Sequence, residues 1–358
     1  MGLVIGTIAS FSAPAIAQSP APTPPLNRFA DWCLNQKTLA PGAQHTVKLL
    51  VQIARTEDCQ QADKALSELK SLILSDSQIS DLRPLAALTQ LQVLLLNSNQ
   101  ITDLEPLINL TNLTWLSLDT NKITDLRPLA SLTKLENLLL DTNKITDLSP
   151  LVSLTNLTSL LLYNNQISDL TPLASLTNLQ TLALYHNKIS DISPLASLTN
   201  LTALSLYDNQ IVDLSSLASL TNLKTLLLFE NRIADLRPLT SLTNLETLTL
   251  FENKISDLSP LSRLTNLREL LLGNNPVTDL KPLRSLTRLN KLSLFNTRVS
   301  DIRPLKSLTT LTRLDLYNTR VTDISVLKSM PRLTELDLRK TPLKTKVCPI
   351  KPTSVCRF

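Results

Sequence analysis

The chain has 358 residues, 43% hydrophobic and 18% charged, which is ordinary for a folded protein and excludes wholesale disorder. Only 4 Gly, 2 His and 3% aromatic residues accompany an excess of Leu, Asn, Thr and Asp, a bias that indicates a repeated unit. The formal charge of +5 is unevenly distributed along the chain, because residues 281–358 hold 17 Lys or Arg against 5 Asp or Glu. This basic end would attract acidic partners or simply favour solubility.

The N-terminal residues have the composition of an export signal. Residues 1–17 are small and apolar, and Ala15-Ile16-Ala17 forms an A-x-A cleavage site, although no Lys or Arg precedes the apolar stretch. Residues 18–27 are rich in Pro and predict an extended linker. No later segment has the roughly 18 uninterrupted apolar residues of a transmembrane helix. We therefore expect a secreted, periplasmic or cell-surface protein with no membrane span.

Residues 28–66 predict a helical N-terminal cap. Apolar residues recur at helical spacing near Thr46–Arg55 and Gln60–Leu69, which we interpret as two amphipathic helices. A stack of repeats leaves its first apolar layer open, so a segment that covers this layer is needed.

Residues 67–342 form thirteen units with a period of 22 residues, the last one truncated, with no insertion or deletion between them. The unit that begins at Leu91 reads LQVLLLNSNQITDLEPLINLTN, and positions within a unit are numbered from this first Leu. The first positions are Leu69, Leu91, Leu113, Leu135, Leu157, Leu179, Leu201, Leu223, Leu245, Leu267, Leu289, Leu311 and Leu333. A unit of this size cannot bury its leucines alone, so the pattern predicts an α/β solenoid in which neighbours cover one another.

Several positions have a predicted structural role. Leucines at positions 4 and 6 alternate with period two and predict a short strand with both leucines inward, so positions 3, 5 and 7 face outward. Position 9 is Asn from Asn99 to Asn275 and Thr in the last three units; these side chains can satisfy backbone groups where the chain leaves the strand. Position 13 is Asp from Asp81 to Asp323, usually with Pro three residues later, which predicts a capped helical turn.

Residues 343–358 predict a C-terminal cap. The four cysteines, Cys33, Cys59, Cys348 and Cys356, all lie outside the repeats, which favours one disulfide at each end in an oxidising compartment. Sequence alone does not fix the pairing. However, a disulfide needs Cα atoms within about 7 Å, and a solenoid holds its ends much farther apart, so we expect Cys33–Cys59 and Cys348–Cys356. Neither pair has the C-x-x-C spacing of a zinc site.

The pattern L-T-N-L-x-x-L-x-L…N-x-I-x-D-L-x-P-L resembles the leucine-rich-repeat superfamily, in particular the 22-residue class of bacterial internalin-like proteins. The resemblance implies a horseshoe or arc with a parallel β-sheet on the concave face and short 3-10 or helical turns on the convex face. It also implies protein recognition through concave side chains between the structural leucines. Cytosolic scaffolds that regulate phosphatases share this repeat class, but they lack signal peptides and paired cysteines.

Aromatic residues are concentrated at outward positions of the predicted strands. They are Trp115 at position 3 and, at position 7, Tyr163, Tyr185, Tyr207, Phe229, Phe251, Phe295 and Tyr317. We interpret them as a partner-binding stripe, because aromatic residues are enriched in binding interfaces. Alternatively, rings on adjacent strands about 4.8 Å apart stack on one another without binding anything.

Acidic residues flank this stripe and extend the candidate site. Asp208, Glu230 and Glu252 occupy position 8 of consecutive units, and a partner with a basic segment would fit them. Towards the C-terminus the outward residues are mixed in charge, and cross-strand pairing accounts for them equally well. These are Lys291, Arg313, Asp315, Asp337 and Arg339.

The sequence contains no motif for catalysis or for a cofactor. It has no P-loop, no G-x-G-x-x-G and no H-E-x-x-H, and its histidines, His45 and His186, are far apart in the repeat order. One Asp per unit falls short of the six to eight oxygens that calcium takes. We expect no enzymatic activity, no cofactor and no metal.

These observations predict an exported, monomeric binding module that recognises a protein or peptide through its concave face, with no nucleic-acid partner. One alternative is a polysaccharide-binding surface protein, because sugars also stack on rows of aromatic residues. A second alternative is an intracellular scaffold that regulates an enzyme such as a phosphatase.

Overall fold

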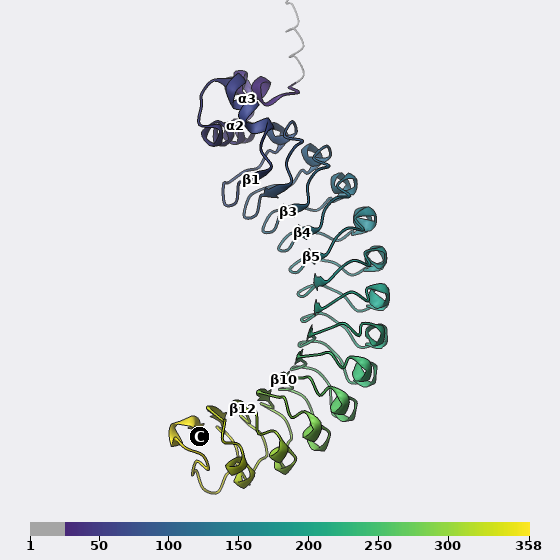
Figure 1. Cartoon of the computed structure of the whole chain (residues 1–358), viewed down its shortest axis with the longest axis vertical. Coiled ribbons are helices and arrows are strands. Elements are labelled where there is room, and N and C mark those ends of the chain that lie inside the picture. The colour runs from purple at the N-terminus through teal and green to yellow at the C-terminus, as the bar shows by residue number, and fades with distance from the viewer. Residues whose placement is uncertain (1–25) are drawn as a thin grey trace, which may run out of the picture.

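The chain forms a curved solenoid in which each repeat is one coil (Figure 1). This computed structural model describes residues 26–358; the expected export signal, residues 1–17, and the linker up to residue 25 lie outside the described residues. Strands line the inner side of the arc and 3-10 turns line its outer side, which confirms the expected leucine-rich-repeat architecture. Between residues 26 and 358, no helix combines the length and apolarity needed to cross a membrane.

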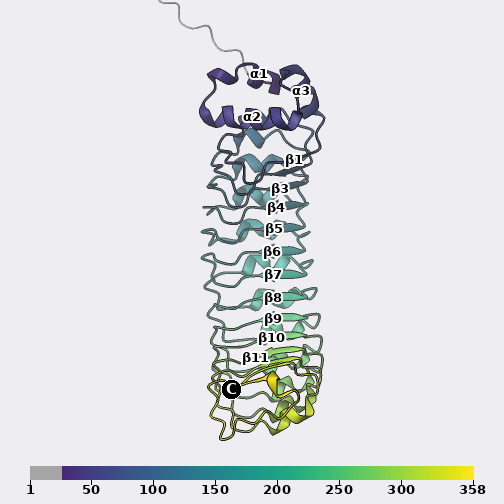
Figure 2. The same ribbon diagram turned by 90° about the vertical axis from the view of Figure 1, so that its left-hand side faces the viewer.

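Three α-helices cover the first coil (Figure 2). They are α1 (Phe29–Leu34), α2 (Pro41–Ala54) and α3 (Cys59–Ser67), with the 3-10 turn η1 (Gln36–Thr38) after α1. Helix α2 starts before the segment in which the apolar spacing predicted it, because Pro41 is well suited to a first helical turn. The pattern did not predict α1, whose 6 residues are too few for a visible period.

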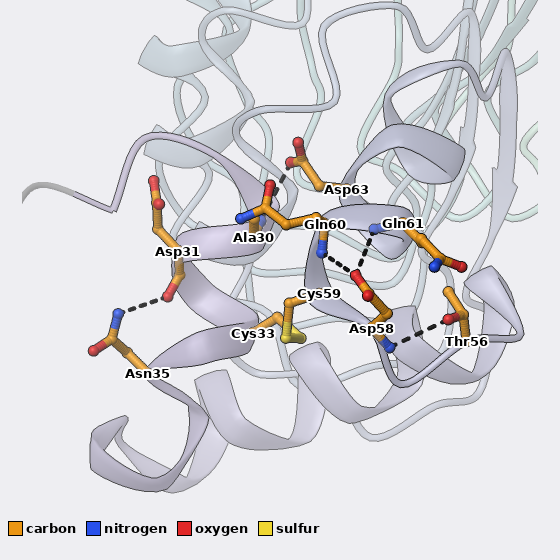
Figure 3. The surroundings of a disulfide bond; sticks show 10 residues. All are labelled: Ala30, Asp31, Cys33, Asn35, Thr56, Asp58, Cys59, Gln60, Gln61 and Asp63. Atoms are coloured by element: carbon orange, nitrogen blue, oxygen red, sulfur yellow. Dashed lines mark hydrogen bonds between the residues drawn. A yellow bond between two sulfur atoms is a disulfide. The ribbon is translucent and has the colours of Figure 1, made fainter.

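The N-terminal cap is held together by covalent and polar contacts. A disulfide joins Cys33 in α1 to Cys59 in α3, with Cα atoms 5.6 Å apart (Figure 3). The buried carboxylate of Asp63 in α3 accepts the backbone N–H of Ala30 at 3.2 Å and pairs with the Arg28 guanidinium. These contacts fix α1 on α3.

One parallel sheet runs through the described part of the chain, with its 14 strands in sequence order. They are β1 (Ser71–Ile73), β2 (Val93–Leu95), β3 (Trp115–Ser117), β4 (Asn137–Leu139), β5 (Ser159–Leu161), β6 (Thr181–Ala183), β7 (Ala203–Ser205), β8 (Thr225–Leu227), β9 (Thr247–Thr249), β10 (Glu269–Leu271), β11 (Lys291–Ser293), β12 (Arg313–Asp315), β13 (Glu335–Asp337) and β14 (Cys356–Arg357). From β1 to β13 each residue pairs with its equivalent in the next unit, as Leu204 does with Leu226. Each position of the unit therefore forms a column along the solenoid.

Each unit returns through a 3-10 turn on the convex face. The turns are η2 (Arg83–Leu85), η3 (Glu105–Leu107), η4 (Arg127–Ser131), η5 (Ser149–Ser153), η6 (Thr171–Ser175), η7 (Ser193–Ser197), η8 (Ser215–Ser219), η9 (Arg237–Ser241), η10 (Ser259–Arg263), η11 (Lys281–Ser285), η12 (Arg303–Ser307) and η13 (Ser325–Ser329). In the twelve complete units, the Asp at position 13 accepts the backbone N–H two residues later, at 2.8–3.0 Å. This bond caps each turn, as the sequence predicts.

The leucines form one continuous core. Leu204 and Leu206, at positions 4 and 6 of one unit, are 0% exposed, and the same cluster extends from Phe29 in the N-terminal cap to Val355 near the C-terminus. Each such side chain contributes about 1.5–3 kcal/mol when it is fully buried.

The position-9 asparagines join successive coils through buried hydrogen bonds. The Asn209 amide donates to the carbonyls of Leu184 at 3.0 Å and Leu206 at 3.1 Å, and its oxygen accepts the Ile189 N–H at 3.0 Å. In the last units the equivalent Thr297 hydroxyl donates to one carbonyl of its own unit, at 2.6 Å. Threonine thus replaces only part of the asparagine network.

The C-terminal residues close the opposite end of the solenoid. A disulfide between Cys348 and Cys356, with Cα atoms 5.8 Å apart, anchors β14, which pairs with β13. The 3-10 turn η14 (Thr353–Val355) places Val355 on the last core layer. Both expected disulfides are present, and the described residues contain no free cysteine.

Replacing Asn209 by Ala should lower the free energy of unfolding by on the order of 2–4 kcal/mol, because buried backbone groups at Ile189 and Leu184 lose their partner. Urea denaturation followed by circular dichroism measures this change. The matched control is Asn222→Ala at exposed position 22, where one hydrogen bond to Thr199 is lost and a change within about 0.5 kcal/mol is expected. Equal effects of the two substitutions would contradict a special role for position 9.

Acid should weaken the turn caps. The hydrogen bond from Arg303 lowers the pKa of Asp301 to about 2, and the matching arginines lower the pKa of Asp125 and Asp235. A carboxylate whose folded pKa lies below its unfolded value stabilises the fold above the unfolded pKa, and this stabilisation is lost as pH falls through the folded pKa. We expect melting temperature to fall between about pH 4 and pH 2. Replacing the three aspartates by Asn, which keeps an acceptor that does not titrate, should flatten this fall; an unchanged profile would refute the assignment.

Candidate binding site on the concave face

The strands place three columns of side chains on the concave face. In β7, Leu204 at position 4 is buried, whereas Ala203 and Ser205 at positions 3 and 5 are partly exposed. Position 7 follows each strand and also faces outward. All eight aromatic residues singled out from the sequence lie in these columns. The strands that carry the columns line the inner side of the arc (Figure 1).

Five of these aromatic side chains form a continuous stack, which we call the aromatic ladder: Tyr163, Tyr185, Tyr207, Phe229 and Phe251. Neighbouring ring centroids are 4.0–4.2 Å apart and the ring planes differ by 10–14°. The rings are therefore half-buried against one another, as the stacking alternative anticipated. Each ring face inside the stack is covered by the next ring, and every ring remains partly exposed.

A glycine interrupts the ladder, and the next ring fills the gap. Gly273 occupies position 7 after Phe251, and a Cβ there would lie 2.0 Å from the ring of Phe295. Because Gly273 has no side chain, Phe295 leans across it and approaches Phe251 with a centroid distance of 6.2 Å and a tilt of 49°.

Two further aromatic residues lie apart from the ladder. Trp115 in β3 is 42% exposed and lies in register between Val93 of β2 and Asn137 of β4. Tyr317 lies beneath two cations, with Arg339 at 5.4 Å and Lys340 at 5.1 Å from its ring centroid. The stripe expected from the sequence is thus divided into a stack and two separate contacts.

The ladder hydroxyls stay protonated over the physiological range. Burial raises the pKa of Tyr185 to about 12 and also raises the pKa of Tyr207. Burial, and then the interaction with Asp141, raises the pKa of Tyr163. The three hydroxyls also interact with one another and with Asp141, which engages their protons. Their oxygens keep lone pairs that can accept hydrogen bonds from a ligand.

The acidic residues form a rim beside the ladder. Asp208, Glu230 and Glu252 each have a left-handed backbone, with φ of 49–55°, and each donates its N–H to a carbonyl of the next unit at 2.9–3.1 Å. His186 occupies the same column and hydrogen-bonds to Asp208. Burial raises the pKa of Glu230, followed by repulsion from Glu252 and Asp208. A cation placed beside this rim would relieve that repulsion.

Charges at the C-terminal end of the concave face are mostly paired with one another. Lys291 lies 2.6 Å from Glu269 on the adjacent strand, and Arg339 pairs with Asp337. Lys291, Arg313 and Asp337 line a hollow of about 290 Å³. Cross-strand pairing therefore explains much of the mixed charge in this region.

The sequence interpretation overlooked the apolar residues at position 5. Leu95, Leu139, Leu161, Leu227 and Leu271 are partly exposed between the ladder column and position 3. The period-two alternation already placed position 5 outward, so the signal was present, but only the rarer aromatic residues stood out against a leucine-rich background. Beside the ladder, Leu161 and Leu227 add apolar surface to the candidate site, and the other ladder units carry Ala183, Ser205 and Thr249 at this position.

A groove of about 870 Å³ lies beside the strands and not on the concave face. It is lined by positions 22 and 2, including Asn178 and Asn200, whose amides donate to carbonyls of the preceding unit at 2.9 Å. These amides therefore join coils to one another. Among residues 26–358, no three His, Cys, Asp or Glu side chains are grouped to hold a metal ion.

The repeats match the family model for leucine-rich repeats (2 copies) at residues 67–110, 111–153, 155–197, 177–219, 221–263, 265–307 and 309–351. The coils are thus leucine-rich repeats. The structure is similar to the internalin InlF from Listeria monocytogenes, with a TM-score of 0.83, 36% identity and coverage of 90% of this chain and 98% of that one. The chain therefore belongs to the internalin-like leucine-rich-repeat proteins.

Other similarities are more distant. The functional domain of InlJ from Listeria monocytogenes, which includes a cysteine ladder, gives a TM-score of 0.74 at 27% identity and covers 90% of this chain and 72% of that one. The plant peptide hormone receptor RGFR1, in complex with RGF2, shares the fold alone, with a TM-score of 0.64, 22% identity and coverage of 77% of this chain and 52% of that one. No curated protein sequence matches significantly.

Ring stacking should stabilise the solenoid in proportion to the number of neighbouring rings. Phe229→Leu keeps apolar volume but loses two stacked partners, so it should cost about 1–3 kcal/mol, since an aromatic pair contributes about 0.5–1.5 kcal/mol. Phe295→Leu loses one tilted partner and should cost at most about 1.5 kcal/mol. Urea unfolding compares them; equal losses would mean that stacking does not stabilise the ladder.

Proposed function

We propose that this protein is an exported binding protein that holds a protein or peptide segment on its concave face, with the aromatic ladder at the centre of the site. The observation that carries the proposal is the row of partly exposed rings and tyrosine hydroxyls, which has an acidic rim on one side and the partly exposed Leu161 and Leu227 on the other. Tyrosine and phenylalanine give large contact areas at low entropic cost, and buried rings at the centre of an interface dominate binding energy.

The orientation of the rings supports a peptide over a polysaccharide. A sugar that stacks on an aromatic residue needs an open ring face, and in the ladder each inner face is covered by the next ring at 4.0–4.2 Å. Ring edges carry partial positive charge and suit carbonyl oxygens and other rings. A peptide offers both of these, together with backbone groups for the tyrosine hydroxyls.

The acidic rim supports a basic segment in the partner. Burial, and then repulsion from Glu252 and Asp208, raises the pKa of Glu230, and a Lys or Arg side chain would be attracted to these three carboxylates. We propose a binding role without enzymatic activity.

The disulfides support an extracellular or periplasmic location. Two closed disulfides persist in oxidising compartments and are rare in the cytosol. This favours export over the alternative of an intracellular scaffold. A protein of the same fold, RGFR1, is a peptide hormone receptor, which supports a peptide as the ligand class.

A direct test screens the chain against displayed linear peptides and against a glycan array. We expect capture of peptides with aromatic and basic residues, and at least about 100-fold weaker binding after joint replacement of Tyr185, Tyr207, Phe229 and Phe251 by Ser. Circular dichroism must confirm that this variant remains folded. The control replaces Val152 and Val212, exposed apolar residues outside the concave columns, by Ser and should bind normally. Capture of glycans alone, or wild-type affinity in the ring variant, would refute the proposal.

Removing charge from the rim should slow association without disturbing the ladder. The variant Asp208→Asn, Glu230→Gln and Glu252→Gln keeps side-chain size, so its melting temperature should change little. Binding to a captured basic peptide should weaken, mainly through the association rate, and should lose much of its salt dependence. Surface plasmon resonance at several salt concentrations measures both. A salt dependence equal to that of the wild type would show that the rim does not contact the ligand.

A further inference from the structure

The convex face changes character over the last three complete units. Position 18 lies within or just after each 3-10 turn and is uncharged in the first nine units: Ala86, Ile108, Ala130, Val152, Ala174, Ala196, Ala218, Thr240 and Ser262. In the next three units it is Arg284, Lys306 and Lys328. The earlier units serve as the reference for these three residues, because they carry a small or apolar residue at the same structural position.

These three cations, which we call the basic column, are exposed and not neutralised by neighbours. They lie on η11, η12 and η13, which follow one another along the outer side of the arc (Figure 1). All three are exposed, and no ion pair within residues 26–358 involves them.

Two further cations at position 15 adjoin the basic column. Lys281 is exposed, and Arg303 pairs with Asp301 at 2.8 Å. Arg284, Arg303 and Lys306 line an open hollow of about 540 Å³ between η11 and η12. The carboxylates near these turns are one Asp per unit, Asp279, Asp301 and Asp323, and each is engaged in capping a turn. The surface therefore keeps an excess of positive charge.

We propose that the basic column binds a linear anionic polysaccharide, whose acidic groups recur along the polymer as the cations recur along the solenoid. Arginine and lysine both recognise sulfate, phosphate and carboxylate groups, arginine through paired N–H donors. This site lies on the face opposite the aromatic ladder. A polymer held there leaves the concave face free, so the protein can be retained at a glycan-rich surface while it binds its partner.

A polysaccharide fits this surface better than a membrane or a nucleic acid. Peripheral membrane binding buries apolar side chains as well as attracting cations, and no exposed large hydrophobic residue lies on η11, η12 or η13. Proteins that bind single-stranded nucleic acids add aromatic side chains for base stacking, and these three turns contain none. The disulfides also favour a compartment in which extracellular glycans are the common polyanions.

The test measures binding of heparin, a probe for anionic polysaccharides, by isothermal titration calorimetry at several salt concentrations. The column variant Arg284→Ala, Lys306→Ala and Lys328→Ala restores the residue that earlier units carry. Its affinity should fall at least about tenfold, and the slope of log affinity against log salt should decrease by about 2–3, since each neutralised anion releases about one counterion.

The matched control removes the same charge elsewhere: Lys122→Gln, Lys144→Gln and Lys188→Gln, three exposed residues at position 10, where other units carry Gln. Its affinity for heparin should change less than about twofold, because salt screens heparin from charges that lie far from the basic column. Equal losses of affinity in the two variants would mean that net charge alone attracts heparin. Wild-type affinity in the column variant would show that the basic column is not the binding site. Tighter binding to phosphatidylserine vesicles or to duplex DNA than to heparin would overturn the ligand class.

Discussion

The structure depends on one constraint: a 22-residue coil can bury its leucines only against the coils above and below it. This requirement explains why residues of β1 to β13 pair with the residue 22 positions on, as in Leu204 with Leu226, and why the thirteen units tolerate no insertion. It also explains the caps, because the first and last coils each have one uncovered side. Helix α2 covers one end and β14 with Val355 covers the other, and each cap is closed by a disulfide.

Strict register converts sequence positions into columns, and columns into surfaces of different chemistry. Position 9 becomes a buried row of amides, position 7 a stack of rings, and position 8 a rim of charges. The backbone at position 8 is left-handed even where Glu, His or Thr occupies it, which costs on the order of 1–3 kcal/mol each. Hydrogen bonds from these residues to the next coil hold that conformation. Contacts between coils therefore override the preference of these residues for a negative φ.

Periodicity was sufficient to predict the fold, because the same alternation that makes a strand also determines which side chains are inward. It also placed the aromatic residues on the concave face. It could not predict how the rings lie, since ring orientation depends on neighbouring side chains: Phe295 tilts only because Gly273 leaves space, and Tyr317 is covered by Arg339 and Lys340. Helix α1 escaped prediction because a helix of 6 residues has no measurable period.

The central claim is that the aromatic ladder contacts the ligand, and the tyrosines allow a direct measurement. The chain has only 4 tyrosines, three in the ladder and Tyr317 farther along the same column. Labelling with 3-fluorotyrosine gives each of them a fluorine resonance, assigned by replacing each tyrosine with Phe. Addition of a captured peptide should shift the signals of Tyr185 and Tyr207 most, whereas heparin should shift neither. A saturating peptide that leaves all tyrosine signals unchanged would contradict binding on the ladder.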